Sequence, residues 1–194
     1  MRVFVLSTGR CGSVTFAAAC GHLTNWTAAH ESLSRKSGPA RFDYPDRHIE
    51  VDNRLSWFFG PLAERFDDDR TLYVHLRRDP EAVAQSYLRR WDNPNRASMI
   101  RAFAHGIVQR KRDWPEGERL EVCRAYVDTV TANIDAFCAD RPSMTIWLER
   151  AEEQFPAFLE RIGAEGDLDA AVAEWDTVHN SSPDRDQEAR PAST

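Results

Sequence analysis

Residues 7–15 read Ser-Thr-Gly-Arg-Cys-Gly-Ser-Val-Thr, and this stretch decides the fold that we expect for the chain. It follows an apolar run at 3–6 that predicts a buried strand, and it precedes an apolar segment that predicts a helix over 13–23. Gly9 and Gly12 allow a tight turn and a close approach of the backbone to a ligand. Because N–H groups and a helix N-terminus then face one point, we expect this turn to bind a phosphorylated ligand.

The end of this loop separates it from the phosphate-binding loop of nucleoside triphosphatases, which it resembles in outline. In those enzymes a Gly-Lys-[Ser/Thr] ending contacts the β- and γ-phosphates and magnesium. Here Ser13 and Val14 follow Gly12, so the lysine is missing. The sequence therefore disfavours ATP hydrolysed with magnesium as the ligand.

Predicted strands and helices alternate along the whole chain. Further strands are expected at 26–30, 48–51, 71–76 and 144–148, and further helices at 54–66, 80–91, 97–112, 118–139, 151–162 and 167–175. This alternation predicts an α/β fold, with three layers, a P-loop-like arrangement and a mainly parallel central sheet flanked by helices. Residues 1–180 are expected to form one domain, and the polar residues 181–194 a flexible C-terminal tail.

Several polar residues directly follow predicted strands: Ser7, Glu31, Asn53 and Arg78. The carboxyl ends of parallel strands lie at one edge of a sheet, where α/β proteins bind their ligands. We therefore expect these residues to converge on one crevice. For Asn53 the preferred role is different, since its position favours capping of the following helix.

Composition excludes several classes of protein. The formal net charge of −6 argues against a general nucleic-acid or acidic-membrane binder, whose surface is usually basic. The four cysteines have no Cys-x-x-Cys or Cys/His pairing, so neither a zinc site nor a disulfide framework is expected. No signal segment or membrane-spanning run is present, and the expected location is the cytoplasm.

A second informative stretch is Leu-Arg-Arg-Asp-Pro-Glu-Ala-Val-Ala-Gln-Ser at 76–86. Arg78 lies at the end of a predicted strand, and Ser86 lies eight residues later in the second turn of the next helix, which Asp79 caps. An arginine and a hydroxyl placed in this way can hold one phosphate from two sides. A surface ion pair is the alternative role for Arg78.

Together the two stretches resemble the PAPS-dependent sulfotransferase family. The 5′-phosphosulfate loop of that family reads Gly-Arg-[Ser/Cys]-Gly-[Ser/Thr], which residues 9–13 match. Its 3′-phosphate motif reads Arg-x-Pro with a serine eight residues after the arginine, which Arg78, Pro80 and Ser86 match. The resemblance covers residues 1–91, and a stretch from Trp175 to Asn180 is similar to the C-terminal part of some bacterial members.

The resemblance implies transfer of a sulfuryl group from 3′-phosphoadenosine 5′-phosphosulfate (PAPS) to a hydroxyl or amine of a small or peptidic acceptor. The desulfated product is 3′,5′-ADP (PAP), and no metal is expected. Arg10 would offset the charge on the leaving bridging oxygen. The donor-binding residues that the resemblance implies are Thr8, Gly9, Arg10, Cys11, Gly12, Ser13, Val14, Arg78 and Ser86.

The base that accepts the acceptor's proton has three candidates. Members of the family commonly carry a catalytic Glu or His where His30 and Glu31 stand, and Glu31 is narrowly favoured. Glu50 lies near the position of a Glu-Lys-[Ser/Thr]-Pro motif of the carbohydrate-sulfating members. Val51 replaces its lysine here, which argues against a carbohydrate acceptor of that type.

Two alternatives to a sulfotransferase remain, a P-loop kinase or NTPase and a non-catalytic nucleotide-binding module. The adenine-stacking residue is open between Trp26 and Trp175, and core packing is the more common role for either. Cys11 at a helix start has either a lowered thiol pKa or a simple space-filling role. Acceptor identity and oligomeric state are not determined by the sequence.

Overall fold

One parallel sheet organises the chain, whose computed structural model describes residues 1–93, 98–108 and 114–177. Its strands are β1 (Arg2–Leu6), β2 (Thr27–His30), β3 (His48–Val51), β4 (Thr71–Arg77) and β5 (Ser143–Trp147). They are ordered β2-β3-β1-β4-β5, and every neighbouring pair is parallel. The predicted α/β class with a parallel central sheet is therefore confirmed.

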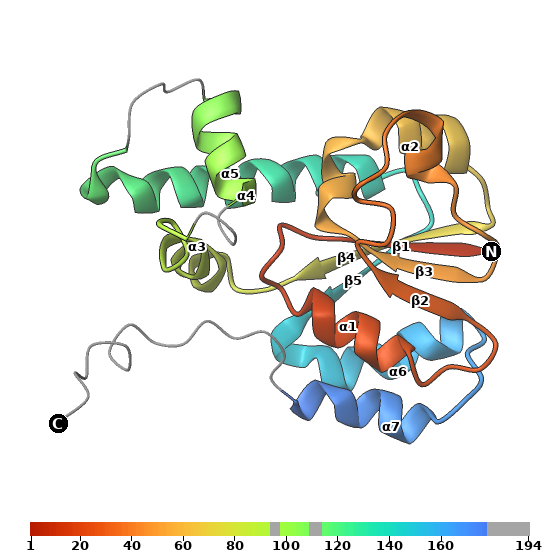
Figure 1. Cartoon of the computed structure of the whole chain (residues 1–194). Helices are drawn as coiled ribbons and strands as arrows, with labels where there is room; N and C mark the ends of the chain where they lie inside the picture. Colours follow the sequence, from red (N-terminus) through yellow and green to blue (C-terminus); the bar gives the residue numbers. More distant parts are fainter. Residues whose placement is uncertain (94–97, 109–113, 178–194) are drawn as a thin grey trace, which may run out of the picture.

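Helices cover both faces of the sheet (Figure 1). One face carries α1 (Ser13–Cys20), α6 (Ala151–Arg161) and α7 (Leu168–Ala173). The other carries α2 (Phe59–Phe66) and the long α5 (Glu116–Cys138), with α3 (Pro80–Leu88) packed against α5 and α4 (Ser98–Ala102) nearby. Short turns of 3₁₀-helix are η1 (Gly38–Phe42), η2 (Asn53–Trp57), η4 (Leu148–Arg150) and η5 (Glu174–Asp176), and η3 (Phe103–Ile107) is a π-helix.

The core forms on both sides of β1, whose apolar residues 3–6 are completely buried. A central parallel strand loses both faces to helices, which explains its uninterrupted apolar sequence. On the α1 face, Phe16 packs edge-on against Phe155, with ring centroids 5.3 Å apart. On the opposite face, Phe4 lies 5.8 Å from the ring of Tyr73.

From β1 the chain first builds β2 and β3 on one side of the sheet and then passes to β4 and β5 on the other side of β1. The segment through α1 leads from β1 to β2 across one face, whereas the segment through α2 leads from β3 to β4 across the other (Figure 1). Neighbouring strands whose connections leave on opposite faces form a topological switch point, where α/β proteins hold ligands. The loop after β1 lies at this point.

The prediction of one continuous helix over 54–66 was wrong. A 3₁₀-helix ends at Trp57, and a separate α-helix begins at Phe59. Pro61 has no N–H to donate to an earlier turn, but it fits the first turn of a new helix. The capping role expected for Asn53 was also wrong, because Asp52 caps η2 by accepting a hydrogen bond from the Arg54 N–H at 2.8 Å.

Other helix limits differ by a few residues. The helix expected over 13–23 ends at Cys20, and the one expected over 80–91 ends at Leu88. The helix expected over 97–112 lies partly outside the described residues, as does the expected tail at 181–194. No helix in the described ranges is long and apolar enough to cross a membrane.

Candidate functional site

The loop after β1 has an unusual backbone. Gly9, Arg10 and Gly12 have φ values of 78°, 64° and 85°, all in the left-handed region. A non-glycine residue adopts this region rarely and at a cost in free energy, and such residues are frequent at functional sites. Among the described residues, Arg10 shares a positive φ with two other non-glycine residues, Glu31 and Arg47.

Position 9 requires glycine because of the neighbouring side chains as well as because of its positive φ angle. A Cβ atom there would lie 2.5 Å from Tyr87 Oη and 2.9 Å from Asn53 Nδ2. Tyr87 and Asn53 are buried, so neither side chain has free space into which it could withdraw. The loop therefore packs closely on its inner side.

On its outer side the loop leads into the start of α1. Gly12 is the N-cap and supplies no side chain to cap the helix, and the first turn carries no acidic residue. The first N–H groups of a helix have no intrahelical acceptor and carry a partial positive charge. Of the other predicted loop residues, Thr8 is buried, whereas Ser13 and Val14 are half-buried in the first turn. This end of α1 suits an anion.

The two predicted phosphate-binding segments meet at this loop. Arg10 Nε donates a hydrogen bond to Ser86 Oγ at 3.0 Å, although 76 residues separate them. Arg78 donates from NH1 to the Arg10 carbonyl at 3.2 Å. Arg78, one of the residues expected at this crevice, and Ser86 therefore both contact Arg10 of the loop.

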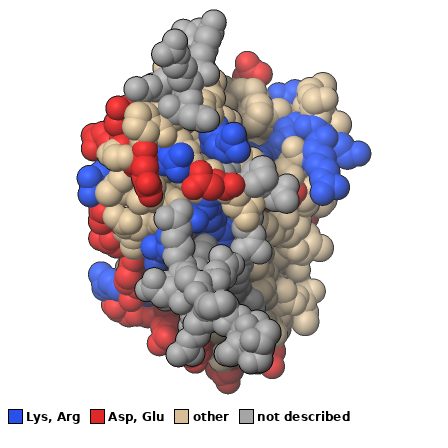
Figure 2. All heavy atoms as spheres, turned by 60° about the vertical axis from the view of Figure 1, so that its left-hand side comes forward, with Lys and Arg blue, Asp and Glu red and all other residues tan. Residues whose placement is uncertain are grey.

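Two further arginines, Arg78 and Arg90, lie close enough to Arg10 to change its pKa. Burial, followed by the positive charges of Arg90 and Arg78, lowers the pKa of Arg10 to about 10, although Tyr87 opposes this shift. Figure 2 shows Lys and Arg side chains near the middle of the face turned forward, with Asp and Glu side chains beside them. Arg90 is buried and stands four residues after Ser86, about one helical turn further along the chain. An anion bound here would reduce the repulsion among these groups.

The inner side of the loop is held by two tyrosines that were not predicted to be site residues from the sequence. The Thr8 carbonyl accepts hydrogen bonds from Tyr87 Oη at 2.6 Å and from Tyr126 Oη at 2.8 Å. Burial raises the pKa of Tyr126 to about 12 and that of Tyr87 well above its usual value, so both remain protonated donors near neutral pH. Tyr87 lies on α3 and Tyr126 on α5, and no local sequence signal links either to the loop.

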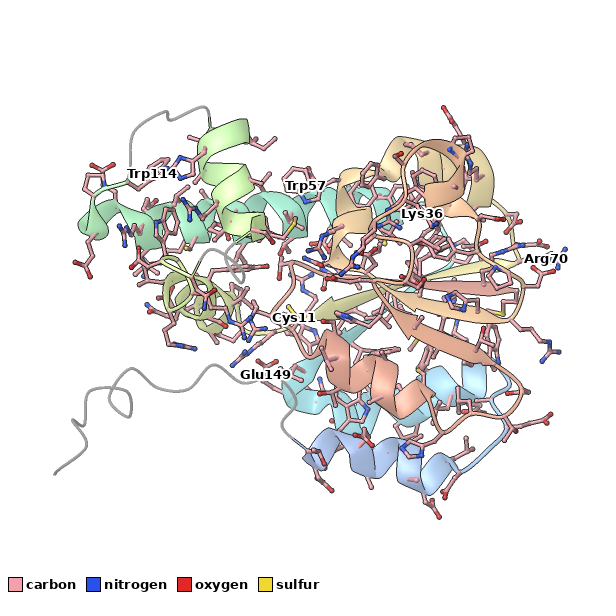
Figure 3. The ribbon with its side chains drawn as sticks, in the orientation of Figure 1. Cys11, Lys36, Trp57, Arg70, Trp114 and Glu149 are labelled. Atoms are coloured by element: carbon pink, nitrogen blue, oxygen red, sulfur yellow. The ribbon has the colours of Figure 1, made fainter. Side chains whose placement is uncertain are left out.

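The Cys11 thiol is a structural part of the loop. It is buried, its Sγ lies 3.1 Å from Thr8 Oγ1, and it donates to the Gly9 carbonyl at 3.2 Å. Burial raises its pKa to about 11. The alternative of a lowered thiol pKa is therefore wrong, because desolvation outweighs the start of the helix. In Figure 3, Cys11 lies at the end of the sheet, between Trp57 and Glu149.

The two favoured candidates for the base lie at the end of β2. His30 is exposed, and its Nε2 lies 3.0 Å from Ser13 Oγ in the first turn of α1. Glu31 has a φ of 53° and forms an ion pair with Arg54. The structure therefore brings His30 to the first turn of α1 and directs the Glu31 carboxylate to η2.

Glu50 occupies a different environment. Its side chain is completely buried, and its carboxylate accepts hydrogen bonds from the Ser32 N–H at 2.7 Å and the Ser32 hydroxyl at 2.6 Å. His48 Nε2 lies 3.0 Å from the same carboxylate. Both oxygens are occupied and shielded from a bound acceptor, so Glu50 fixes the turn after β2 and is unsuited to be the base.

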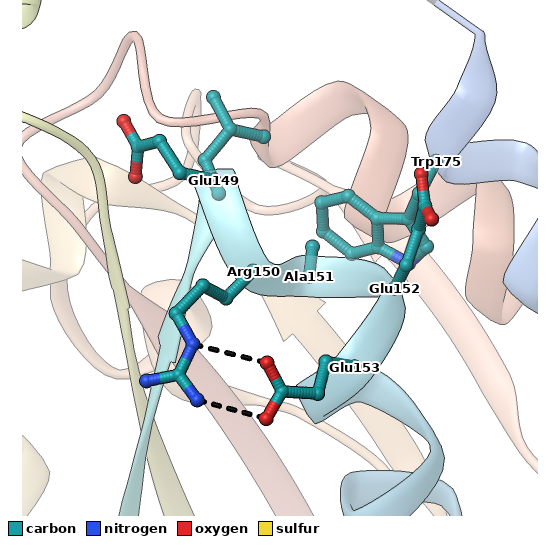
Figure 4. A pocket seen from close by; sticks show the side chains of 7 residues that line it. Glu149, Arg150, Ala151, Glu152, Glu153 and Trp175 are labelled. Carbon is teal, nitrogen blue, oxygen red and sulfur yellow. Dashed lines mark hydrogen bonds and ion pairs between the residues drawn. The ribbon is translucent and has the colours of Figure 1, made fainter.

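A pocket of about 230 Å³ adjoins the loop at the end of β5 (Figure 4). It is lined by residues 148–153 of η4 and α6 and by Trp175. A Cβ at Gly12 would lie 2.7 Å from Leu148 Cδ1 and 3.6 Å from Trp175, so the pocket shares a wall with the loop. Trp26, the other tryptophan considered for stacking, is buried in the core.

The described residues contain no group of three or more His, Cys, Asp and Glu side chains placed to hold a metal ion. No protein-family model, no curated protein and no solved structure matches the chain. The function proposed below is therefore inferred from the geometry of the carboxyl edge of the sheet.

Proposed function

We propose that the protein is a sulfotransferase that moves the sulfuryl group of PAPS to a hydroxyl or amine of a small or peptidic acceptor without a metal ion. The observation that carries this proposal is the contact of Arg10 with Ser86, together with that of Arg78 with the Arg10 carbonyl. These contacts join the loop after β1 to the segment after β4, and a donor with two separated anionic groups needs both.

Each anionic group of the donor has suitable partners. In this proposal the N–H groups at the start of α1 bind the 5′-phosphate and the sulfuryl oxygens. Arg78 and Ser86 bind the 3′-phosphate, the group that distinguishes this donor from ATP. Adenine has a place in the pocket that Trp175 borders, since that pocket shares a wall with Gly12.

Catalysis would depend on positioning and electrostatics, by analogy with phosphoryl transfer. The acceptor oxygen or nitrogen forms a bond to sulfur while the bond from sulfur to the bridging phosphate oxygen breaks, and 3′,5′-ADP leaves. Arg10 offsets the negative charge that develops on the bridging oxygen. The proton of the acceptor passes to a base on the protein.

We assign the base to His30, with Glu31 as the alternative. The contact of His30 Nε2 with Ser13 supports the assignment, because Ser13 belongs to the turn that would hold the transferred group. The Glu31 carboxylate is engaged by Arg54 and would have to leave it to accept a proton. His30→Gln should therefore reduce turnover far more than Glu31→Gln, and the reverse result would move the role to Glu31.

Calorimetric titration tests the donor class. The chain is titrated with 3′,5′-ADP and, in parallel, with AMP, ADP and ATP plus magnesium. Tighter binding of 3′,5′-ADP than of the others is expected, and turnover of labelled PAPS should survive EDTA. Preference for ATP with magnesium would replace the proposal by a P-loop kinase or NTPase. Binding of 3′,5′-ADP without transfer to any acceptor tested would favour a non-catalytic nucleotide-binding module.

A further inference from the structure

The Thr8 carbonyl receives two phenol donors from two different helices. A carbonyl oxygen has two lone pairs, and here Tyr87 occupies one at 2.6 Å and Tyr126 the other at 2.8 Å. The two rings pack edge-on, with centroids 5.1 Å apart and an interplanar angle of 77°. Both side chains are almost fully buried, so no water competes strongly for this carbonyl.

This arrangement acts on the peptide group between Thr8 and Gly9. A peptide group next to glycine can flip at low cost, because glycine accepts both positive and negative φ. A flip would turn the Thr8 carbonyl toward the ligand side, where its partial negative charge would repel an anion. It would also break both phenol hydrogen bonds and leave two buried hydroxyls without this acceptor.

Further contacts hold the same conformation. The Gly9 N–H donates to Ser7 Oγ at 3.0 Å, and the Gly9 carbonyl accepts from Cys11 Sγ at 3.2 Å. The buried Asn53 side chain lies against Gly9 and leaves the loop little room to move inward. The carbonyls of Thr8 and Gly9 are therefore both engaged on the protein side of the loop.

We infer that Tyr87 and Tyr126 are positioning residues for anion binding: they hold the Thr8 carbonyl away from the ligand and so fix the loop backbone from which the N–H groups after Gly9 are directed toward it. Neither residue contacts the ligand in this account. Both act through the Thr8–Gly9 peptide group. The inference rests on the proposed function in one respect only, which is the choice of 3′,5′-ADP as the ligand that tests it.

Tyrosine-to-phenylalanine variants test this inference, since they remove the hydroxyl and keep the ring. Tyr87→Phe and Tyr126→Phe should each weaken 3′,5′-ADP binding by about fivefold, and the double variant by about twentyfold or more. Tyr73→Phe is the matched control, because Tyr73 is also buried and donates to a backbone carbonyl, that of Phe66 at 3.2 Å, outside the loop. The control should bind 3′,5′-ADP like wild type.

A second measurement separates positioning from loss of folding and needs no ligand. Amide hydrogen exchange at residues 9–13 should be faster in Tyr87→Phe and Tyr126→Phe than in Tyr73→Phe. The variants are compared under conditions in which their free energies of unfolding are equal. Wild-type affinity and unchanged exchange in the double variant would overturn the inference. Preference of the wild type for ATP with magnesium would instead overturn the proposed function, and the same variants would then be titrated with ATP.

Discussion

Two parts of the carboxyl edge of the sheet differ in how their charges are balanced. At the carboxyl ends of β2 and β3, cations face carboxylates: Arg41 pairs with Asp52 and Arg54 with Glu31. At the ends of β1 and β4, the positive charges of Arg90 and Arg78 lower the pKa of Arg10. The β2–β3 part is therefore a scaffold of ion pairs, and the β1–β4 part is the one to which we assign the bound anion.

The strongest test of the β1–β4 part is Gly9→Ala. The added Cβ would lie 2.5 Å from Tyr87 Oη, and alanine would have to adopt a φ of 78°. Loss of about 3 kcal/mol of unfolding free energy is expected, together with loss of 3′,5′-ADP binding.

Gly60→Ala is the control for this substitution, measured by the same denaturant titration. Gly60 lies in α2, and a Cβ there meets no atom within 4 Å. Its unfolding free energy should stay equal or rise by up to about 1 kcal/mol, because alanine is the better helix former. Equal losses in the two variants would contradict the assigned tight packing at Gly9.

Arg78→Ala tests ligand binding at the β1–β4 part without a large change in the free energy of unfolding. Removal of the guanidinium should weaken binding of 3′,5′-ADP by roughly 30-fold to 150-fold, since a charge-assisted contact contributes about 2–3 kcal/mol. AMP lacks the 3′-phosphate and should lose far less. Calorimetry with both nucleotides measures this ratio, and an equal loss for both would remove Arg78 from the 3′-phosphate.

Glu50→Gln probes the β2–β3 part and has the smallest expected effect on binding. The amide retains the volume but loses the charge that accepts from Ser32 and faces His48. We expect the unfolding free energy to fall by about 1–2 kcal/mol and 3′,5′-ADP affinity to change by less than about twofold. A tenfold loss of affinity in a folded variant would mean that the two parts are coupled.

The sequence predicted those elements that are determined by residues close together in the chain. The apolar run of β1, the glycines of the loop and the Asp79-Pro80 start of α3 each carry their own signal, and the cap is present, since Asp79 Oδ1 accepts from the Ala82 N–H at 2.7 Å. Arg78 and Ser86 could be placed near the loop because the carboxyl ends of parallel strands share one edge.

Features set by distant contacts could not be predicted from the sequence. No local pattern distinguishes Tyr126 on α5 from an ordinary core residue, although it contacts Thr8, 118 residues earlier. The thiol of Cys11 was ambiguous because its pKa depends on burial, which tertiary packing decides. The Glu50 carboxylate resembled a candidate base because its enclosure by Ser32 and His48 exists only in the folded chain.

The contacts at Thr8 also have a consequence for the order of folding. The two phenols that donate to the Thr8 carbonyl lie 79 and 118 residues after it in the chain. Closing such long-range contacts is slow and comes after local structure has formed. Ligand affinity is therefore expected to arise late in refolding, when α5 docks, so that nucleotide binding would report completion of the native state.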